Sequence, residues 1–155
     1  MVADQLAMQR RCIDRIRKQW PAFVERRRVH LKAHSVDCLP CERIAENILF
    51  ELFTQVLDWA PNEVRWQENR VDLLLTRLGV KYLIIEAKRP GSLDGPGSIA
   101  RAFQQARGYA VRHNVRAVAI SDGDLLDVRD LSAMASGYAS VLSWRPSIPR
   151  KSCGG

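Results

Sequence analysis

The sequence predicts an α/β fold, with one mixed central sheet flanked by helices. Apolar residues recur every three or four positions over residues 44–56, which is typical of an amphipathic helix. They alternate over residues 63–88, which is typical of strands. A loop rich in Gly, Pro and Ser then leads into a second amphipathic helix and two further strands. With 155 residues, 46% of them apolar, the chain is long enough for one core and too short for two.

Residues 1–40 are predicted to form a basic helical extension. Four apolar residues fall close to one helical face, with arginines opposite: Leu6, Ile13, Ile16 and Trp20. Pro21 is expected to end or kink this helix, because proline has no N–H to donate to the preceding turn. A second basic helix can start immediately after it.

Residues 41–144 are predicted to form the α/β domain. Its first helix covers residues 41–59 and ends at Ala60-Pro61-Asn62. Ser98 is the expected N-cap of the second helix, and Asn114 is expected to close it. The expected strands are residues 63–67, 71–76, 81–88, 115–121 and 125–131, with turns at Gly79 and at Asp122-Gly123. The third and fourth strands are expected to be parallel, joined by a right-handed crossover.

Charged residues stand at the end of the otherwise apolar strand 81–88. Alternation along the strand puts Glu86 and Lys88 on one face. If this strand pairs antiparallel with its predecessor about Gly79, paired residue numbers sum to about 158, and Asp72 lies opposite Glu86 with Cβ atoms about 5 Å apart. Two carboxylates and one ammonium group are therefore expected to meet where the strands leave the core.

Two carboxylates at that distance repel each other unless a cation lies between them. Mg²⁺ or Mn²⁺ suits such oxygen ligands, and a lysine beside the ion can orient or help to deprotonate an attacking water. The other interpretation of Asp72, Glu86 and Lys88 is a salt bridge at the margin of the sheet.

Gln105 and Tyr109 are spaced to lie on one face of the helix that follows. Taken in order, Asp72, the strand segment Glu86-Ala87-Lys88, and Gln105-x-x-x-Tyr109 resemble the metal-binding Asp, the ExK strand and the QxxxY helix of the PD-(D/E)XK nuclease superfamily. Within it, the chain looks most like the N-terminal nuclease domain of type I restriction endonuclease R subunits and the RecB-like nucleases. The resemblance covers about residues 42–130 and implies a restriction-endonuclease-like αβββαβ core.

This resemblance implies a metal-dependent nuclease that hydrolyses phosphodiester bonds, in DNA, with Mg²⁺ or Mn²⁺ as cofactor. The metal ligands that it implies are Asp72, Glu86, the backbone carbonyl of Ala87 and a further glutamate, Glu46 or Glu42. Lys88 would be the catalytic lysine, and Gln105 and Tyr109 would position the phosphate backbone or the lysine. The chain has no GxxxxGK[ST] loop, so ATP-driven translocation is not implied.

The net charge of +7 lies on the two ends of the chain. Residues 1–40 hold nine Lys and Arg against four acids, whereas residues 41–144 hold twelve against thirteen. Residues 145–155 hold three and no acid, and they are predicted to be a disordered tail. A basic segment attracts nucleic acid, although a solvated helix face has the same composition. The arginines expected to contact nucleic acid are Arg26, Arg27, Arg28, Arg89 and Arg107.

Three further expectations concern context. No apolar run reaches the roughly 18 to 20 residues of a membrane span, and the N-terminus lacks the order of a signal peptide, so a cytoplasmic protein is expected. A homodimer or a subunit of a larger complex is compatible with cutting both strands of a duplex. The sequence H-x3-H-x3-C-x2-C, at His30, His34, Cys38 and Cys41, offers four zinc ligands on paper, but the signal is weak and ordinary half-buried thiols are the favoured interpretation of these cysteines.

Two other functions stay open. The chain could be a nucleic-acid-binding module that keeps this fold without turnover. It could also be an unrelated α/β protein that binds zinc through the cysteines and histidines of its N-terminal segment.

Overall fold

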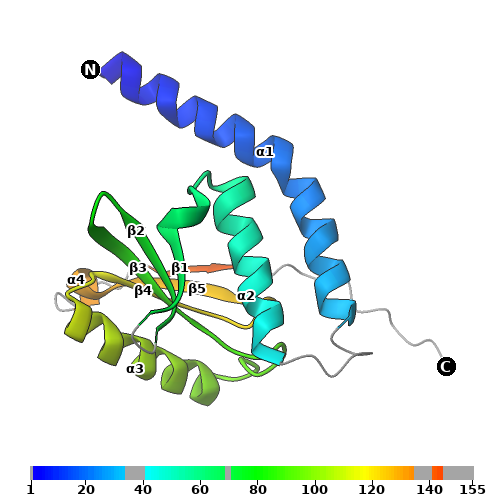
Figure 1. Cartoon of the computed structure of the whole chain (residues 1–155), viewed down its shortest axis with the longest axis vertical. Helices are drawn as coiled ribbons and strands as arrows, with labels where there is room; N and C mark the ends of the chain where they lie inside the picture. The colour runs from blue at the N-terminus through cyan, green and yellow to red at the C-terminus, as the bar shows by residue number, and fades with distance from the viewer. Residues whose placement is uncertain (1, 34–40, 69–70, 135–140, 145–155) are drawn as a thin grey trace.

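A mixed sheet lies at the centre of the molecule in the computed structural model, which describes residues 2–33, 41–68, 71–134 and 141–144 (Figure 1). The strand order is β1-β2-β3-β4-β5-β6. The strands are β1 (Val64–Glu68), β2 (Val71–Arg77), β3 (Val80–Ala87), β4 (Ala117–Ser121), β5 (Leu126–Asp130) and β6 (Val141–Trp144). Strands β3 and β4 are parallel and the other neighbours are antiparallel. The predicted α/β class, mixed sheet and parallel pair are confirmed, whereas β6 was not expected.

The hairpin of β2 and β3 has the register that the sequence predicts. Leu73 pairs with Ile85 and Leu74 with Ile84, so each pair sums to 158. Leu78 and Gly79 both have positive φ, at 51° and 77°, and such a pair makes a two-residue turn whose twist suits a hairpin. The register shifts by one residue after Leu75, which confines the irregularity to the turn end of the hairpin.

Helix α3 (Pro96–His113) covers one face of the sheet (Figure 1). Its buried residues pack on alternate residues of the strands beneath: Phe103, Ala106 and Ala110 from the helix with Leu74, Ile84, Val118 and Ile120 from the sheet. Asn114 ends the helix in the left-handed conformation, as predicted. Gly95, not Ser98, is the N-cap, because Pro96 fits the first helical position with its fixed φ. Ser98 lies inside the first turn.

Helix α2 (Cys41–Glu51) covers the opposite face, where Ala45 and Leu49 pack against Leu73 and Ile85. The helix widens into a π-helical turn, η1 (Leu52–Val56), and a short 3-10 turn, η2 (Pro61–Glu63), leads into β1. The single helix expected over residues 41–59 is therefore shorter and irregular at its end.

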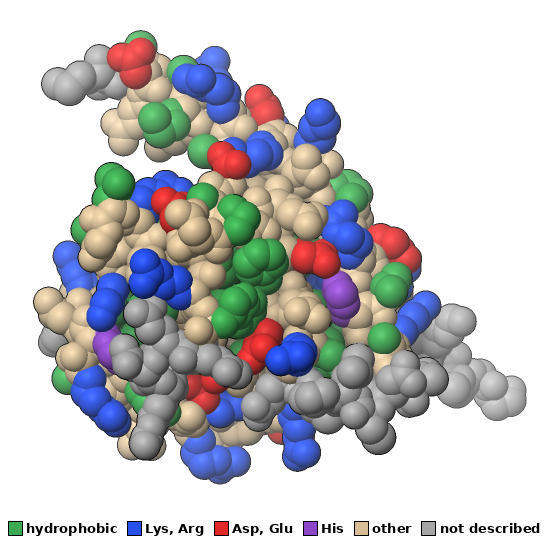
Figure 2. Space-filling view, in the orientation of Figure 1, with side chains coloured by type: hydrophobic (Ala, Val, Ile, Leu, Met, Phe, Trp, Pro, Cys, Tyr) green, Lys and Arg blue, Asp and Glu red, His purple; other side chains and the backbone are tan. Residues whose placement is uncertain are grey.

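Helix α1 (Val2–Ala33) lies outside α2 and continues through Pro21. Figure 1 shows it changing direction about halfway along, so the kink that the sequence allowed is present and a break into two helices is not. Contacts on both sides of the proline hold it, since Ile16 and Phe23 both belong to the apolar layer shared with α2. The first half stands away from the body of the molecule (Figure 2), and Leu6 and Ile13 there are about half exposed, at 51% and 47%.

A short helix, α4 (Leu131–Met134), follows β5. Residues 145–155, predicted to be a disordered tail, lie outside the described residues.

Candidate functional site

Asp72 and Glu86 lie next to each other on neighbouring strands. The register that pairs Leu73 with Ile85 places Asp72 opposite Glu86 one step further along β2 and β3. Asp72 Oδ2 accepts a hydrogen bond of 2.9 Å from the backbone N–H of Ala87, which ties its carboxylate to β3. Strand alternation puts both acids on the face that α3 covers, because Leu74 and Ile84 belong to that core.

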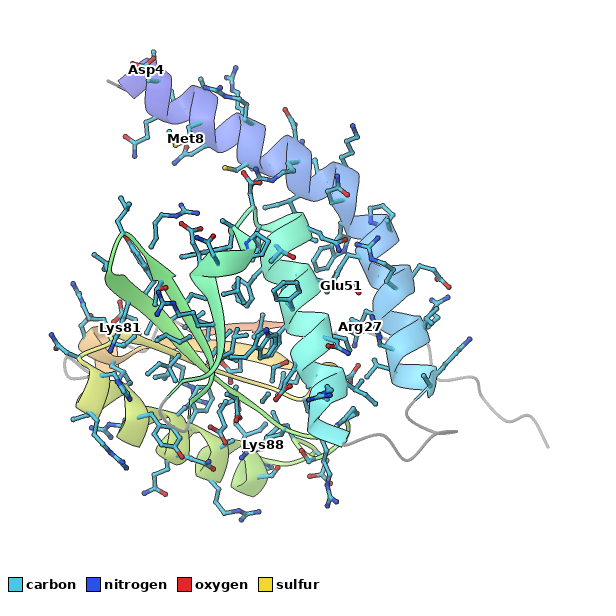
Figure 3. The ribbon with its side chains drawn as sticks, in the orientation of Figure 1. Asp4, Met8, Arg27, Glu51, Lys81 and Lys88 are labelled. Carbon is cyan, nitrogen blue, oxygen red and sulfur yellow. The ribbon has the colours of Figure 1, made fainter. Side chains whose placement is uncertain are left out.

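Glu86 is a buried acid with a cationic partner. Its side chain is 3% exposed, and Lys88 Nζ lies 2.5 Å from Glu86 Oε1. The same ammonium group donates a 3.1 Å hydrogen bond to Gln105 Oε1 on α3. The Lys88 side chain is 27% exposed, so it reaches the surface while its ammonium group contacts the buried Glu86 carboxylate. Lys88 therefore joins the end of β3 to the third turn of α3, and Figure 3 shows it at the end of the sheet beside that helix.

The packing of β3 explains why these charges end the strand. Ile84 and Ile85 are completely buried between the two helical layers. Strand β4 runs alongside, with Glu86 opposite Ile120, and its Ser121 carbonyl accepts a 2.8 Å hydrogen bond from the Lys88 N–H. Beyond this point the chain leaves the sheet. The carboxyl ends of parallel strands are where α/β sheets commonly open toward ligands.

A surface depression of about 310 Å³ opens beside Lys88. The loop after β3 and the first turns of α3 enclose it, with Ser92, Ser98, Arg101 and Gln105 among its lining residues. The loop is anchored by Asp122, which is 2% exposed and accepts hydrogen bonds from the N–H groups of Leu93 at 3.2 Å and Leu125 at 2.8 Å. Neither Arg101 nor Asp122 was among the residues predicted for the site. The i, i+4 spacing of Arg101 and Gln105 is the signal that could have found the arginine.

Tyr109 occupies a different environment from Gln105. It is half-buried and packs against the core beneath α3. The guanidinium of Arg112 lies 5.5 Å from the centre of its ring. The structure thus brings Asp72, Glu86, Lys88 and Gln105 together and places Tyr109 one turn further along the helix, in a packing role.

Two glutamates on α2, Glu46 and Glu42, were expected as a third carboxylate for a metal. Glu46 lies half-buried on α2, which covers the opposite face of the sheet from Glu86. Among the described residues, no group of three or more His, Cys, Asp and Glu side chains is placed to hold a metal ion. The side chain of Glu42 is outside the described part of the chain. Asp72 and Glu86 are therefore the two acids on which a metal at this site would depend.

Arg27, which the sequence predicted as a contact for nucleic acid, is buried. It is 3% exposed, and its guanidinium donates a 2.8 Å hydrogen bond to the Gly123 carbonyl and pairs with Asp124. Helix α1 buries this residue against the β4–β5 turn, so the arginine fastens the helix to the sheet. Arg26 is also engaged, by Glu51 at 2.8 Å. Arg28 is exposed, with Glu25 3.3 Å away.

Arg89 and Arg107 are exposed, as contact with a nucleic acid requires. Arg107 lines a second cavity, of about 180 Å³, between α3 and β5. Arg129 lies in that cavity with its guanidinium 3.6 Å from the centre of the Phe103 ring, and it pairs with Asp127 at 3.4 Å. Burial raises the pKa of Asp127, and the charge of Arg129 opposes that shift without cancelling it.

The four proposed zinc ligands cannot be assembled from the described residues. His34, Cys38 and the side chain of Cys41 lie outside them. His30 Nε2 is 2.9 Å from Glu51 Oε1, which makes it a partner of that carboxylate. Burial acts to raise the pKa of Glu51, but hydrogen bonds from His30 and Arg26 outweigh it, and the pKa is lowered.

Comparisons with protein-family models, with curated proteins and with solved structures found no match to this chain. None of the described helices has the length and apolar character needed to cross a bilayer.

Proposed function

We propose that this chain is a Mg²⁺- or Mn²⁺-dependent nuclease that hydrolyses phosphodiester bonds in DNA. The observation that carries the proposal is the lysine that bridges a buried acid and a helix: Lys88 Nζ contacts Glu86 Oε1 at 2.5 Å and Gln105 Oε1 at 3.1 Å. Asp72 adjoins this group through the Ala87 N–H. A structural salt bridge needs only one acid and one base. Here a second acid, Asp72, and the side-chain amide of Gln105 lie beside the pair of Glu86 and Lys88.

The donors at this point suit a hard divalent cation. Two carboxylates from adjacent strands offer oxygen ligands, which Mg²⁺ prefers, and water would complete its shell. The Ala87 carbonyl can add a third oxygen, because the N–H of that residue already points toward β2 and the two groups of one strand residue point the same way. When bound, such an ion would activate water and stabilise the charge that develops on phosphate.

The residues of the chain supply the remaining functions. The Lys88 ammonium can donate to a non-bridging phosphate oxygen or hold the attacking water, because it is fixed between Glu86 and Gln105 and reaches solvent. Gln105 keeps the lysine over the strand end and has an exposed amide N–H₂ that can donate to the phosphate backbone. The burial of Glu86 means that any cation bound there is held in a poorly solvated setting, where its charge acts strongly.

The element order supports a restriction-endonuclease-like core. Helix α2, strands β1, β2 and β3, helix α3 and strand β4 follow one another as αβββαβ. The two acids fall on the second and third strands of this order, which is where the resemblance requires them. We further propose that the protein acts in the cytoplasm, either as a homodimer or as a subunit of a larger complex.

The second candidate function is a nucleic-acid-binding module without turnover. It is favoured because, among the described residues, no group of three acid, His or Cys side chains is placed to hold a metal ion, and a site with two carboxylates holds a divalent ion less tightly than one with three. The two candidates make the same prediction for binding and opposite predictions for cleavage.

The deciding experiment is cleavage of plasmid and single-stranded DNA in Mg²⁺, Mn²⁺ or EDTA. The wild-type chain should cut in either metal and lose activity in EDTA. Glu86→Gln and Lys88→Met should each lower the rate by at least about 100-fold, the usual effect of removing one group that acts on the transition state. Glu63→Gln is the matched control, since Glu63 is also an acid paired with a base, Arg77, at 2.8 Å. Cleavage that survives both site variants would rule out the proposal, and binding without cleavage would establish the second candidate.

A further inference from the structure

The depression beside Lys88 is lined by cations and hydroxyl groups. Its lining residues that carry charge are Lys88 and Arg101, and both are bases. Ser92 and Ser98 also line it, but each donates its hydroxyl hydrogen to a loop carbonyl, that of Arg89 and Gly95 respectively, both at 2.8 Å, so the two bases decide its charge. The lining therefore favours a small anion.

Arg101 is the cation of this depression whose hydrogen-bond donors are unused among the described residues. In the part of the chain that the structure describes, no hydrogen bond or ion pair engages its guanidinium, whereas Lys88 is held by Glu86 and Gln105. The guanidinium folds back over the first turn of α3, since a β-carbon placed on Gly97 would lie 3.6 Å from Arg101 Nη1. The glycine leaves this surface open. The positive end of an 18-residue helix adds to the field there.

The carboxylate nearby does not neutralise the arginine. Asp94 is exposed and lies 3.4 Å from the Ser98 hydroxyl, on the loop side of the first turn. Among the described residues, no ion pair joins Asp94 to Arg101.

The position of Arg101 relative to Gln105 suggests what the anion is. The two residues are four positions apart on α3, about 6 Å along the helix. A nucleic-acid strand presents a phosphate roughly every 3.4 Å of duplex axis. A strand with one phosphate at Lys88 therefore carries its neighbouring phosphates within reach of Arg101.

We propose that this depression is a binding site for a second phosphate of the substrate strand, with Arg101 as its principal ligand. The proposal rests on the proposed function for the identity of the strand, but not for the anion chemistry. Arg101 is a positioning residue, which fixes the register of the strand relative to Lys88. The phosphate can belong to the interior of the strand or to its end.

The test is the salt dependence of binding in EDTA, where no metal-dependent cleavage occurs. Fluorescence anisotropy of a labelled single strand should be measured between about 50 and 200 mM salt, the range over which phosphate contacts change affinity most visibly. One lost phosphate contact lowers the slope of log K against log salt by about 0.7 for a single strand. Arg101→Gln should show that decrease. At 50 mM salt, 20-fold below the 1 M reference, this slope corresponds to binding about eightfold weaker.

Two variants control the measurement. Arg116→Gln removes the same charge at the opposite end of the sheet, just before β4, and should leave the slope unchanged. Arg101→Lys keeps the charge at the site and should keep the slope, which separates loss of an ion contact from loss of fold. Equal slopes for Arg101→Gln and Arg116→Gln, or no salt-dependent binding by the wild-type chain, would overturn the proposal.

Comparing strands that end in a phosphate with strands that end in a hydroxyl shows whether the site binds a terminal or an internal phosphate. If Arg101→Gln weakens strands with phosphate ends only, the site takes a terminal phosphate. If it weakens hydroxyl-ended strands equally, the site takes an internal phosphodiester. Cleavage by the wild-type chain in Mg²⁺, measured in parallel, separates this proposal from the proposed function: an Arg101 effect without cleavage defeats the nuclease alone, and cleavage without an Arg101 effect defeats this site alone.

Discussion

The contact between Glu86 and Lys88 makes a sharp prediction about stability. Replacing Lys88 with methionine leaves the buried Glu86 carboxylate without its cation. Replacing Glu86 with glutamine removes the buried charge and keeps a hydrogen-bond acceptor for the lysine. The first change should therefore destabilise the chain much more than the second, although each removes one member of the same pair.

The size of the effect follows from the geometry. At 2.5 Å and an effective dielectric constant of about 20, Coulomb's law gives a gross attraction of roughly 6 to 7 kcal/mol. The burial of Glu86 costs several kcal/mol in lost hydration, which offsets most of that attraction. Lys88 is 27% exposed, and solvent weakens the pair further. We expect a net coupling of about 2 kcal/mol, with Lys88→Met destabilising by about 2 to 3 kcal/mol and Glu86→Gln by less than about 1.

The assay is a double-mutant cycle in urea at pH 7, followed by tryptophan fluorescence. The wild type, both single variants and the double variant supply the coupling free energy, and the double variant should be about as stable as Glu86→Gln. For a domain of this size, 2 kcal/mol corresponds to a shift of roughly 4 to 8 °C in Tm. Lys81→Met is the control on the same strand, since Lys81 is exposed and lies 3.3 Å from His113; it should change stability by less than about 0.5 kcal/mol. A coupling energy below about 0.5 kcal/mol would refute the reasoning.

Two further predictions concern residues away from the site. Gly123→Ala should destabilise by about 2 to 4 kcal/mol, because Gly123 has φ +84° and an added β-carbon would lie 2.9 Å from Ile48 Cδ1. Gly91→Ala, at φ +79° with no atom within 4 Å of the added carbon, should cost only about 1 kcal/mol, and equal urea midpoints for the two variants would contradict the packing argument. Burial raises the pKa of Asp127 above its usual 3.8, so the folded chain binds this proton more tightly than the unfolded chain does. The free energy of unfolding of the chain therefore falls as pH rises through the folded-state pKa of Asp127. Asp127→Asn should therefore gain stability relative to wild type between about pH 4 and 7 in urea titrations, and a constant difference across that range would count against the assignment.

The sheet and the pairing of its acids could be predicted because they depend on local patterns. A two-residue turn at Leu78-Gly79 sets the hairpin register, and the register alone decides that Asp72 faces Glu86. The end of α3 at Asn114 is also local, since a left-handed residue closes the helix by its own backbone conformation. Both predictions needed only residues within about 15 positions of one another.

Other predictions failed where distant contacts outweighed local preference. The kink expected at Pro21 is present, but the separate second helix expected after it is not, because apolar contacts with α2 on either side of the proline keep α1 continuous. Arg27 has the composition of a surface arginine, and its burial depends on carbonyl groups almost 100 residues later. β6 was missed because its pairing with β5 joins two short segments, for which alternation over four residues is a weak signal.

Read by itself, the sequence determined the fold class, the order of the elements and the face on which Asp72, Glu86 and Lys88 lie, because alternation and helical spacing are properties of the backbone. Only the tertiary structure decided which of the flanking residues belong to the site. It brought Gln105 to the lysine, packed the half-buried Tyr109 against the core, and gathered Arg101 and the loop around one depression. These outcomes depend on how α2 and α3 sit on the sheet, and that placement is settled by the packing of whole layers.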